Sequence, residues 1–268
     1  MVFLQHSIIR HTTIEKMLKY AVQLNALFIP ANSVQSSLSR YTHPPVIHNH
    51  NEEIYTCSLR GSSIGIYYRK RYLLLCTRHQ LNGCDYKDVG LIDKDGDSLH
   101  TSAGSWHYPP SVNETDLNDL IVFDFTAPCN YSPYMKEWFF SLECFPPNSP
   151  SNGIIAFIIS GYPSQEQKYN LGEEEKHLGF RRESITCLLG SYDDQVKGDP
   201  SILCLSYDHN SDFNPDGMSG GAAFVIQLVN GKPRAYLAGM VVRAGNGKFY
   251  ILRIGFIQKF IDQYLDRL

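Results

Sequence analysis

The chain has 268 residues, 43% hydrophobic and 19% charged, and this ordinary globular composition excludes a disordered or fibrous protein. Its formal net charge of −3 argues against strong attraction to nucleic acid or to an anionic membrane surface. The sequence contains no run of about 18 apolar residues that would mark a membrane span. Residues 1–10 lack the charged start and apolar core of a signal peptide.

The seven cysteines are odd in number and no two have Cys-x-x-Cys spacing, which disfavours a disulfide framework or a zinc site. We therefore expect reduced, buried thiols in a cytoplasmic protein. His43, His48 and His50 have no Cys or acidic residue spaced with them as a ligand set. The segment 93–97 resembles part of a calcium loop but lacks the glutamate that such a loop needs. We predict no metal and no cofactor.

Residues 1–52 are predicted to form an N-terminal helix and a loop. Thr12 and Glu15 make a capping box, and the apolar residues that follow have helical spacing. Pro30 ends the pattern, so the helix is expected over roughly 12–28. Residues 31–52 are rich in Ser, Pro and His and are predicted to be a loop.

Residues 53–145 are predicted to form a first β-barrel. Short apolar runs separated by turn residues indicate a meander of strands at 54–59, 63–68 and 72–77. His79 stands just past the third strand, where a rigid backbone can present a general base, and Asp119 stands just before the apolar run 120–125. Alone, each is also typical of an ordinary strand end or turn.

Residues 146–268 are predicted to form a second β-barrel, joined to the first by the proline-rich connection 128–150. Its expected strands cover residues 153–160, 180–190, 202–207, 222–229 and 235–243. Apolar residues at helical spacing over 257–268 predict a C-terminal helix that lies across this second half.

The segment Gly217-Met218-Ser219-Gly220-Gly221 stands immediately before one of these strands. Glycines allow backbone angles closed to other residues and let another chain approach closely. A nucleophilic serine needs this setting, with an exposed Oγ and backbone N–H groups aimed at a developing oxyanion. Taken alone, the segment is equally typical of a glycine-rich turn.

His79, Asp119 and Ser219 follow one another in the chain order of the serine-protease triad on paired β-barrels. Here the sequence resembles the trypsin/chymotrypsin-like serine peptidases over residues 53–268. The resemblance rests on Gly217–Gly221, on Leu74–His79, on Asp119–Val122, on Gly161–Pro163 and on the C-terminal helix. It implies an all-β fold of two packed six-stranded antiparallel β-barrels, with an N-terminal and a C-terminal helix.

The resemblance also implies a role for each residue. Ser219 would attack a peptide carbonyl, His79 would take and return the proton, and Asp119 would orient the imidazole. The backbone N–H groups of Gly217 and Ser219 would form the oxyanion hole. Asp116 competes for the role of the acid, but Asp119 is preferred because the apolar strand follows it at once.

Two positions depart from secreted trypsins. Gln80 follows His79 where they have a disulfide, and Met218 precedes Ser219 where they have the aspartate that pairs with a new N-terminus. Activation by that ion pair is not available, so the chain is expected to resemble the cytoplasmic bacterial, Deg/HtrA-like branch. The enzyme would then be constitutively assembled, or switched by a partner or by the ordering of a loop. No PDZ-like domain is expected after the barrels, which departs from the HtrA pattern.

The specificity pocket of the family corresponds here to Phe213, Val242, Arg243 and Ala244. Phe213 suits an apolar or modest-sized side chain, whereas Arg243 would select an acidic one. Asp212 and Asp216 leave a basic preference open.

We predict a selective or regulatory serine endopeptidase that acts on a protein or peptide, with a regulatory protein partner left open. The alternative is a catalytically silent double-barrel module for protein interaction. A viral-type cysteine protease is disfavoured, because Ser219 holds the nucleophile position.

Overall fold

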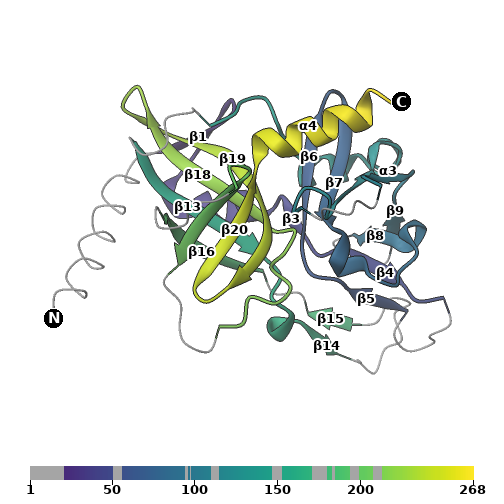
Figure 1. Ribbon diagram of the computed structural model, residues 1–268. Helices are drawn as coiled ribbons and strands as arrows, with labels where there is room; N and C mark the ends of the chain where they lie inside the picture. Colours follow the sequence, from purple (N-terminus) through teal and green to yellow (C-terminus); the bar gives the residue numbers. More distant parts are fainter. Residues whose placement is uncertain are drawn as a thin grey trace.

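The computed structural model describes residues 21–50, 56–93, 96, 98–109, 115–146, 153–170, 180–182, 185–193, 199–207 and 213–268. Within these residues the chain forms mainly strands with a few short helices, and the strands gather in two groups (Figure 1). None of the described helices has the length and apolar character needed to cross a membrane.

Six strands of the second half close into a ring in which every neighbouring pair is antiparallel. In spatial order they are β18 (Ala222–Val229), β13 (Ile154–Gly161), β16 (Thr186–Tyr192), β17 (Ile202–Tyr207), β20 (Lys248–Arg253) and β19 (Lys232–Gly245). Pairing of β19 with both β20 and β18 closes the ring. At Gly239 of β19 a Cβ would lie 2.0 Å from the Leu252 carbonyl oxygen, so only glycine permits this close approach.

The first half consists of two sheets with a core between them. The larger sheet contains β10 (Ser105–His107), β11 (Leu120–Asp124), β7 (Arg71–Thr77), β6 (Ser63–Tyr68), β12 (Phe140–Ser141) and β3 (Thr42–His43). The smaller contains β5 (Cys57–Leu59), β4 (Val46–His48), β8 (Val89–Ile92) and β9 (Leu99–Thr101). Side chains from both sheets, among them Ile47, Leu74, Val89 and Phe123, form one buried cluster. The predicted all-β fold is confirmed, and the second half forms the predicted closed six-stranded antiparallel barrel. The first half differs from the second barrel, because its strands form two facing sheets and β12 pairs with β6 in parallel.

A second buried cluster joins the two halves. Successive side chains of a strand point to opposite faces, so Leu74 of β7 faces the core of the first half while Leu73 and Leu75 face the cluster between the halves. Phe224 of β18 reaches the same cluster from the other half. The apolar runs are continuous because both faces of these strands are buried.

The remaining described elements are short. They are the strands β1 (Val22–Leu24), β2 (Leu27–Ile29), β14 (Lys168–Asn170) and β15 (Phe180–Arg182), the helices α2 (Val34–Ser39) and α3 (Thr126–Tyr131), and the 3₁₀ turns η1 (Ala31–Ser33), η2 (Arg78–Leu81), η3 (Tyr86–Asp88), η4 (Pro133–Trp138) and η5 (Ser164–Glu166).

The N-terminal segment corrects the prediction. Residues 12–20 of the predicted helix lie outside the described residues, but residues 22–29 form the hairpin β1–β2, with β1 parallel to β19. The predicted loop contains η1, α2, β3 and β4, and the last two pair with β6 and β8 of the first half. Pairing with β19 buries Val22 and Leu24, and such tertiary contacts override a local helical pattern.

The proline-rich connection 128–150 is partly helical. It contains most of α3 and all of η4, and it buries Met135 and Trp138 in the core of the first half. The single strand expected over 180–190 is two strands, β15 and β16, in different sheets.

The C-terminal helix α4 (Ile254–Leu265) follows β20 directly and passes over the first half (Figure 1). Gln258 Nε2 donates a hydrogen bond to the Tyr68 hydroxyl at 3.0 Å. Arg69 forms ion pairs with Asp262 at 3.2 Å and with Asp266 at 2.9 Å. The helix was predicted to lie across the second half, but it ties the two halves together.

We expect Phe260→Ala to lower the free energy of unfolding by about 3–5 kcal/mol. Phe260 is fully buried, and its ring lies 4.8 Å from that of Trp106 in the first half, so truncation leaves a cavity between the halves. Urea unfolding of the wild type and the variant measures the loss. Lys259→Ala, at the exposed neighbouring position, is the control and should change stability by less than about 0.5 kcal/mol. A loss below about 1 kcal/mol at Phe260 would contradict this role.

Candidate active site

His79 and Asp119 meet because they stand at the adjoining ends of two paired strands. β7 and β11 are antiparallel with Thr77 opposite Leu120, so the residues just beyond these two positions are neighbours. The Arg78 backbone N–H donates to the Asp119 carbonyl oxygen at 2.6 Å. Residues 40 positions apart in the sequence are thereby held at one site.

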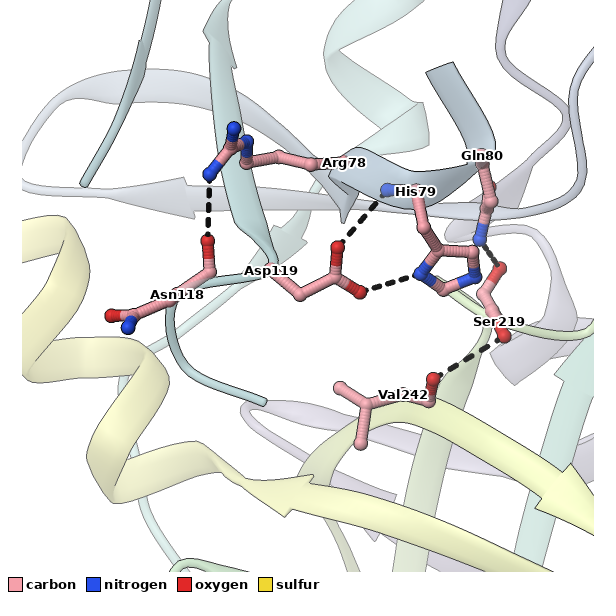
Figure 2. A network of polar contacts seen from close by, with 7 residues as sticks. All are labelled: Arg78, His79, Gln80, Asn118, Asp119, Ser219 and Val242. Carbon is pink, nitrogen blue, oxygen red and sulfur yellow. Dashed lines mark hydrogen bonds and ion pairs between the residues drawn. The ribbon is translucent and has the colours of Figure 1, made fainter. Parts of the chain in front are cut away.

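Two hydrogen bonds join His79 to the Asp119 carboxylate. The Nδ1 atom of His79 lies 2.5 Å from Oδ2, and its backbone N–H donates to Oδ1 at 3.0 Å (Figure 2). The hydrogen bond to Asp119 raises the pKa of the His79 imidazole above its ordinary value, and partial burial opposes the rise. Asp116 instead forms an ion pair with Arg243 at 2.9 Å, so Asp119 is the aspartate that contacts His79.

The turn that carries Ser219 can be built only with glycine at its sharpest points. Gly217 has φ of +90° and Gly220 has φ of +83°, a region that other residues rarely adopt. A Cβ on Gly220 would lie 1.9 Å from the Ser62 carbonyl oxygen, and one on Gly221 would lie 2.3 Å from that of Ser160. The glycines therefore let the turn press against two strand ends.

The imidazole of His79 lies between the Asp119 carboxylate and Ser219 (Figure 2). Ser219 Oγ donates to the Val242 carbonyl oxygen at 3.4 Å, which is long for a hydrogen bond from a hydroxyl. In the described part of the chain no hydrogen bond joins this hydroxyl to His79. Catalytic hydrogen bonds are often long before substrate binds and tighten in the complex.

The backbone N–H groups of Gly217 and Ser219 point away from the groups that hold their peptides in place. The Asp216 carbonyl accepts from the Ser164 N–H at 2.7 Å and the Met218 carbonyl from the Gly221 N–H at 2.9 Å. In a trans peptide the N–H points opposite to the carbonyl, so the Gly217 and Ser219 N–H groups face the other way. Among the described residues neither has an acceptor, which leaves both able to bind an oxyanion.

A cavity of about 540 Å³ lies beside His79 and Asp119. Asp116, Val242 and Arg243 are among the residues that line it, and Arg243 forms an ion pair there with Asp116. The guanidinium of Arg243 also lies 4.8 Å from the centre of the Tyr250 ring. Its charge is thus already paired within the protein.

The other two predicted pocket residues lie elsewhere. Phe213 and Ala244 do not line this cavity. Both pack against the buried cluster inside the second barrel, where the Phe213 ring contacts that of Tyr207 at 5.8 Å. Two of the four residues predicted for specificity therefore line this cavity, and the other two are half-buried against the core of the second barrel.

Two site residues were missed because their contacts are far apart in sequence. Ser62 Oγ donates to the Gly217 carbonyl at 2.6 Å, over 155 positions. Gln80 Nε2 donates to the Ser219 carbonyl, over 139 positions. The sequence singled out Gln80 only because it follows His79, where secreted trypsins have a disulfide. Its place next to His79 was the one sequence signal of a role in the site.

Metal-ligating side chains do not cluster in the described residues. No group of three or more His, Cys, Asp or Glu side chains there could hold an ion. His43 is half-buried and contacts the Trp138 carbonyl at 2.9 Å, and the loss of solvent around it lowers the pKa of its imidazole to about 4. His50 pairs with Asp88 at 2.8 Å. All seven cysteines are free thiols.

Neither a protein-family model nor a curated protein matches the sequence. Among solved structures, human heparin binding protein is similar with a TM-score of 0.49 and 13% identity, over 87% of this chain and 94% of that chain. A mutant of the same human protein gives a TM-score of 0.48 and 12% identity, over 87% and 94% of the two chains. Function therefore rests on the site's own residues.

Proposed function

We propose that this protein is a serine endopeptidase that cleaves peptide bonds through an acyl-enzyme intermediate. The observation that carries the proposal is the hydrogen-bonded His79–Asp119 pair beside Ser219, in a turn with two N–H groups that have no acceptor in the described chain. Each of these groups has a part in acyl transfer.

In the first step, Ser219 Oγ forms a bond to the carbonyl carbon of the substrate while its proton passes to His79 Nε2. The carbonyl oxygen becomes an oxyanion that accepts hydrogen bonds from the Gly217 and Ser219 N–H groups. The carbon–nitrogen bond then breaks, and His79 returns the proton to the leaving amine. Water hydrolyses the ester by the same route, releasing the carboxylate and restoring the Ser219 hydroxyl.

Asp119 contributes by accepting the hydrogen bond from the Nδ1–H of His79. This contact holds the imidazole in the tautomer whose Nε2 is free to accept a proton, and it stabilises the imidazolium that follows. The same hydrogen bond raises the pKa of His79, because it stabilises the protonated imidazolium. The neutral imidazole, and with it activity, is favoured on the alkaline side of that pKa.

We further propose that the enzyme is assembled without cleavage of its N-terminus, as in the cytoplasmic Deg/HtrA-like branch. Support comes from Met218, which is fully buried where a zymogen-type enzyme needs a carboxylate. A Cβ on Gly161 would lie 2.7 Å from the Met218 sulfur, so the Met218 side chain packs directly on the Gly161 backbone. A cytoplasmic location and a protein or peptide substrate stay predictions from the sequence.

The hydrogen bond from Ser219 Oγ to Val242 favours a second candidate, a catalytically silent interaction module. In that case the hydroxyl would stay with the Val242 carbonyl and His79 would never receive its proton. The two candidates differ in one observable, the hydrolysis of peptide bonds.

We expect the purified chain to cleave members of a quenched-fluorescence peptide library at pH 8, with selectivity for a small set of sequences. Mass spectrometry of the products would identify the cleaved bonds. His79→Ala, made and purified in the same way, controls for a contaminating protease and should be inactive. A folded wild type that cleaves no more than His79→Ala would contradict the proposal and favour the silent module.

A further inference from the structure

Ser62 lies where three segments of the chain come together. It is fully buried and stands just before β6. Its own backbone N–H donates to the Ser219 carbonyl at 3.2 Å. Its carbonyl oxygen fills the space where Gly220 would otherwise carry a Cβ. Both contacts are to the turn that carries the nucleophile.

The side chain of Ser62 makes two further hydrogen bonds. Its Oγ accepts from the Tyr162 backbone N–H at 2.8 Å and donates to the Gly217 carbonyl at 2.6 Å. The direction of both bonds is fixed, because an N–H only donates and a carbonyl only accepts. The single hydroxyl proton of Ser62 is therefore committed to Gly217.

That commitment favours one orientation of the Gly217–Met218 peptide. If this peptide rotated by half a turn, it would present its N–H toward Ser62 Oγ in place of its carbonyl. The buried hydroxyl would then lose its acceptor, which is unfavourable. Gly217 is the link most able to rotate, since glycine populates both signs of φ.

The orientation of this peptide matters because it lies between the two oxyanion donors. The Gly217 N–H belongs to the peptide before it and the Ser219 N–H to the peptide after it. The outer peptides are held by Ser164 and Gly221. The middle peptide is held at both ends, because its carbonyl accepts from Ser62 and its N–H donates to the Pro215 carbonyl at 2.9 Å. These four bonds together orient the two oxyanion donors.

We propose that Ser62 is a positioning residue, which holds the Gly217–Met218 peptide so that both oxyanion donors face the substrate. The proposal rests on the proposed peptidase function. In this proposal the neutral, buried hydroxyl of Ser62 orders the turn. Met218 offers no carboxylate at this site for an ion pair that could do so.

The test is Ser62→Ala, compared with Ser63→Ala as a matched control. Ser63 is the next residue and is equally buried, but its Oγ donates to the His43 carbonyl at 2.8 Å, away from the turn. We expect Ser62→Ala to lower kcat by about tenfold or more, short of the 10²–10³ for deleting an oxyanion donor. KM should change little, and the affinity for a peptide aldehyde should fall with kcat. Ser63→Ala should keep the wild-type kcat.

Equal kcat values for the two alanine variants would overturn the proposal. If Ser62→Ala does not fold, Ser62→Cys gives the same comparison, because it keeps a γ atom but donates weakly. A wild type without any peptidase activity would refute the proposed function and leave this inference to a crystal structure of Ser62→Ala. There, a rotated Gly217 carbonyl supports the role of Ser62, and an unchanged one overturns it.

Discussion

Replacing Ser219 by alanine is expected to lower kcat for peptide hydrolysis by about 10⁶-fold. The hydroxyl is the atom that forms the ester with the substrate, and no other group of the site can take its place. Steady-state assays with a cleaved library peptide measure the loss. Ser191→Ala is the matched control, because it removes an exposed hydroxyl of the second barrel whose side-chain partner, within the described residues, is Ser206. A Ser219→Ala variant within tenfold of the wild type would place the nucleophile elsewhere.

Asp119→Asn is expected to lower kcat by about 10⁴-fold. The asparagine amide can donate a hydrogen bond to Nδ1, which stabilises the tautomer with the proton on Nε2. That tautomer cannot accept the proton of Ser219. The effect should fall on kcat with KM nearly unchanged, because Asp119 does not contact the substrate in this mechanism.

The same variant should change the pH dependence. In the wild type, kcat/KM rises with pH as His79 loses its proton, with a midpoint above the ordinary value of about 6.5 because Asp119 raises the pKa. Without that carboxylate the midpoint of the remaining activity should move to lower pH. Asp116→Asn is the control, since Asp116 pairs with Arg243 and not with His79, and it should leave the midpoint in place.

The free energy of unfolding should also depend on pH, because the pKa of His79 differs between the folded and the unfolded chain. The pKa of His79 is higher in the folded than in the unfolded chain, so the pair stabilises the fold fully below about pH 6.5. That contribution disappears as the pH rises through the folded-state pKa. The difference in unfolding free energy between wild type and Asp119→Asn should therefore be larger at pH 6 than at pH 9. An equal difference at both values would contradict the assigned cause.

The strands of both halves, and the places of His79, Asp119 and Ser219 beside them, could be predicted from the sequence because they depend on local patterns. Strands such as β6 and β17 are bounded by turn residues and show clear apolar runs. His79, Asp119 and Ser219 each stand at the end of such a run or in a glycine turn, and antiparallel pairing of β7 with β11 then brings the first two together.

What the sequence could not predict depends on pairing between distant segments. The hairpin β1–β2 exists because β1 adds to the edge of β19, more than 200 positions away, and its residues carry a helical apolar spacing. Ser62 looks like any serine before a strand, and its role follows only from contacts with Tyr162 and Gly217. Arg243 has a visible charge, but its partner Asp116 lies in the other half.

The most direct test of the central claim is the reaction of the intact protein with a fluorophosphonate, followed by mass spectrometry of the digested adduct. An activated nucleophile predicts a single adduct on Ser219, formed at a rate that rises with pH through the pKa of His79. The adduct should be absent from Ser219→Ala and nearly absent from His79→Ala. A folded wild-type chain that forms no adduct on Ser219, or reacts equally well without His79, would contradict the account.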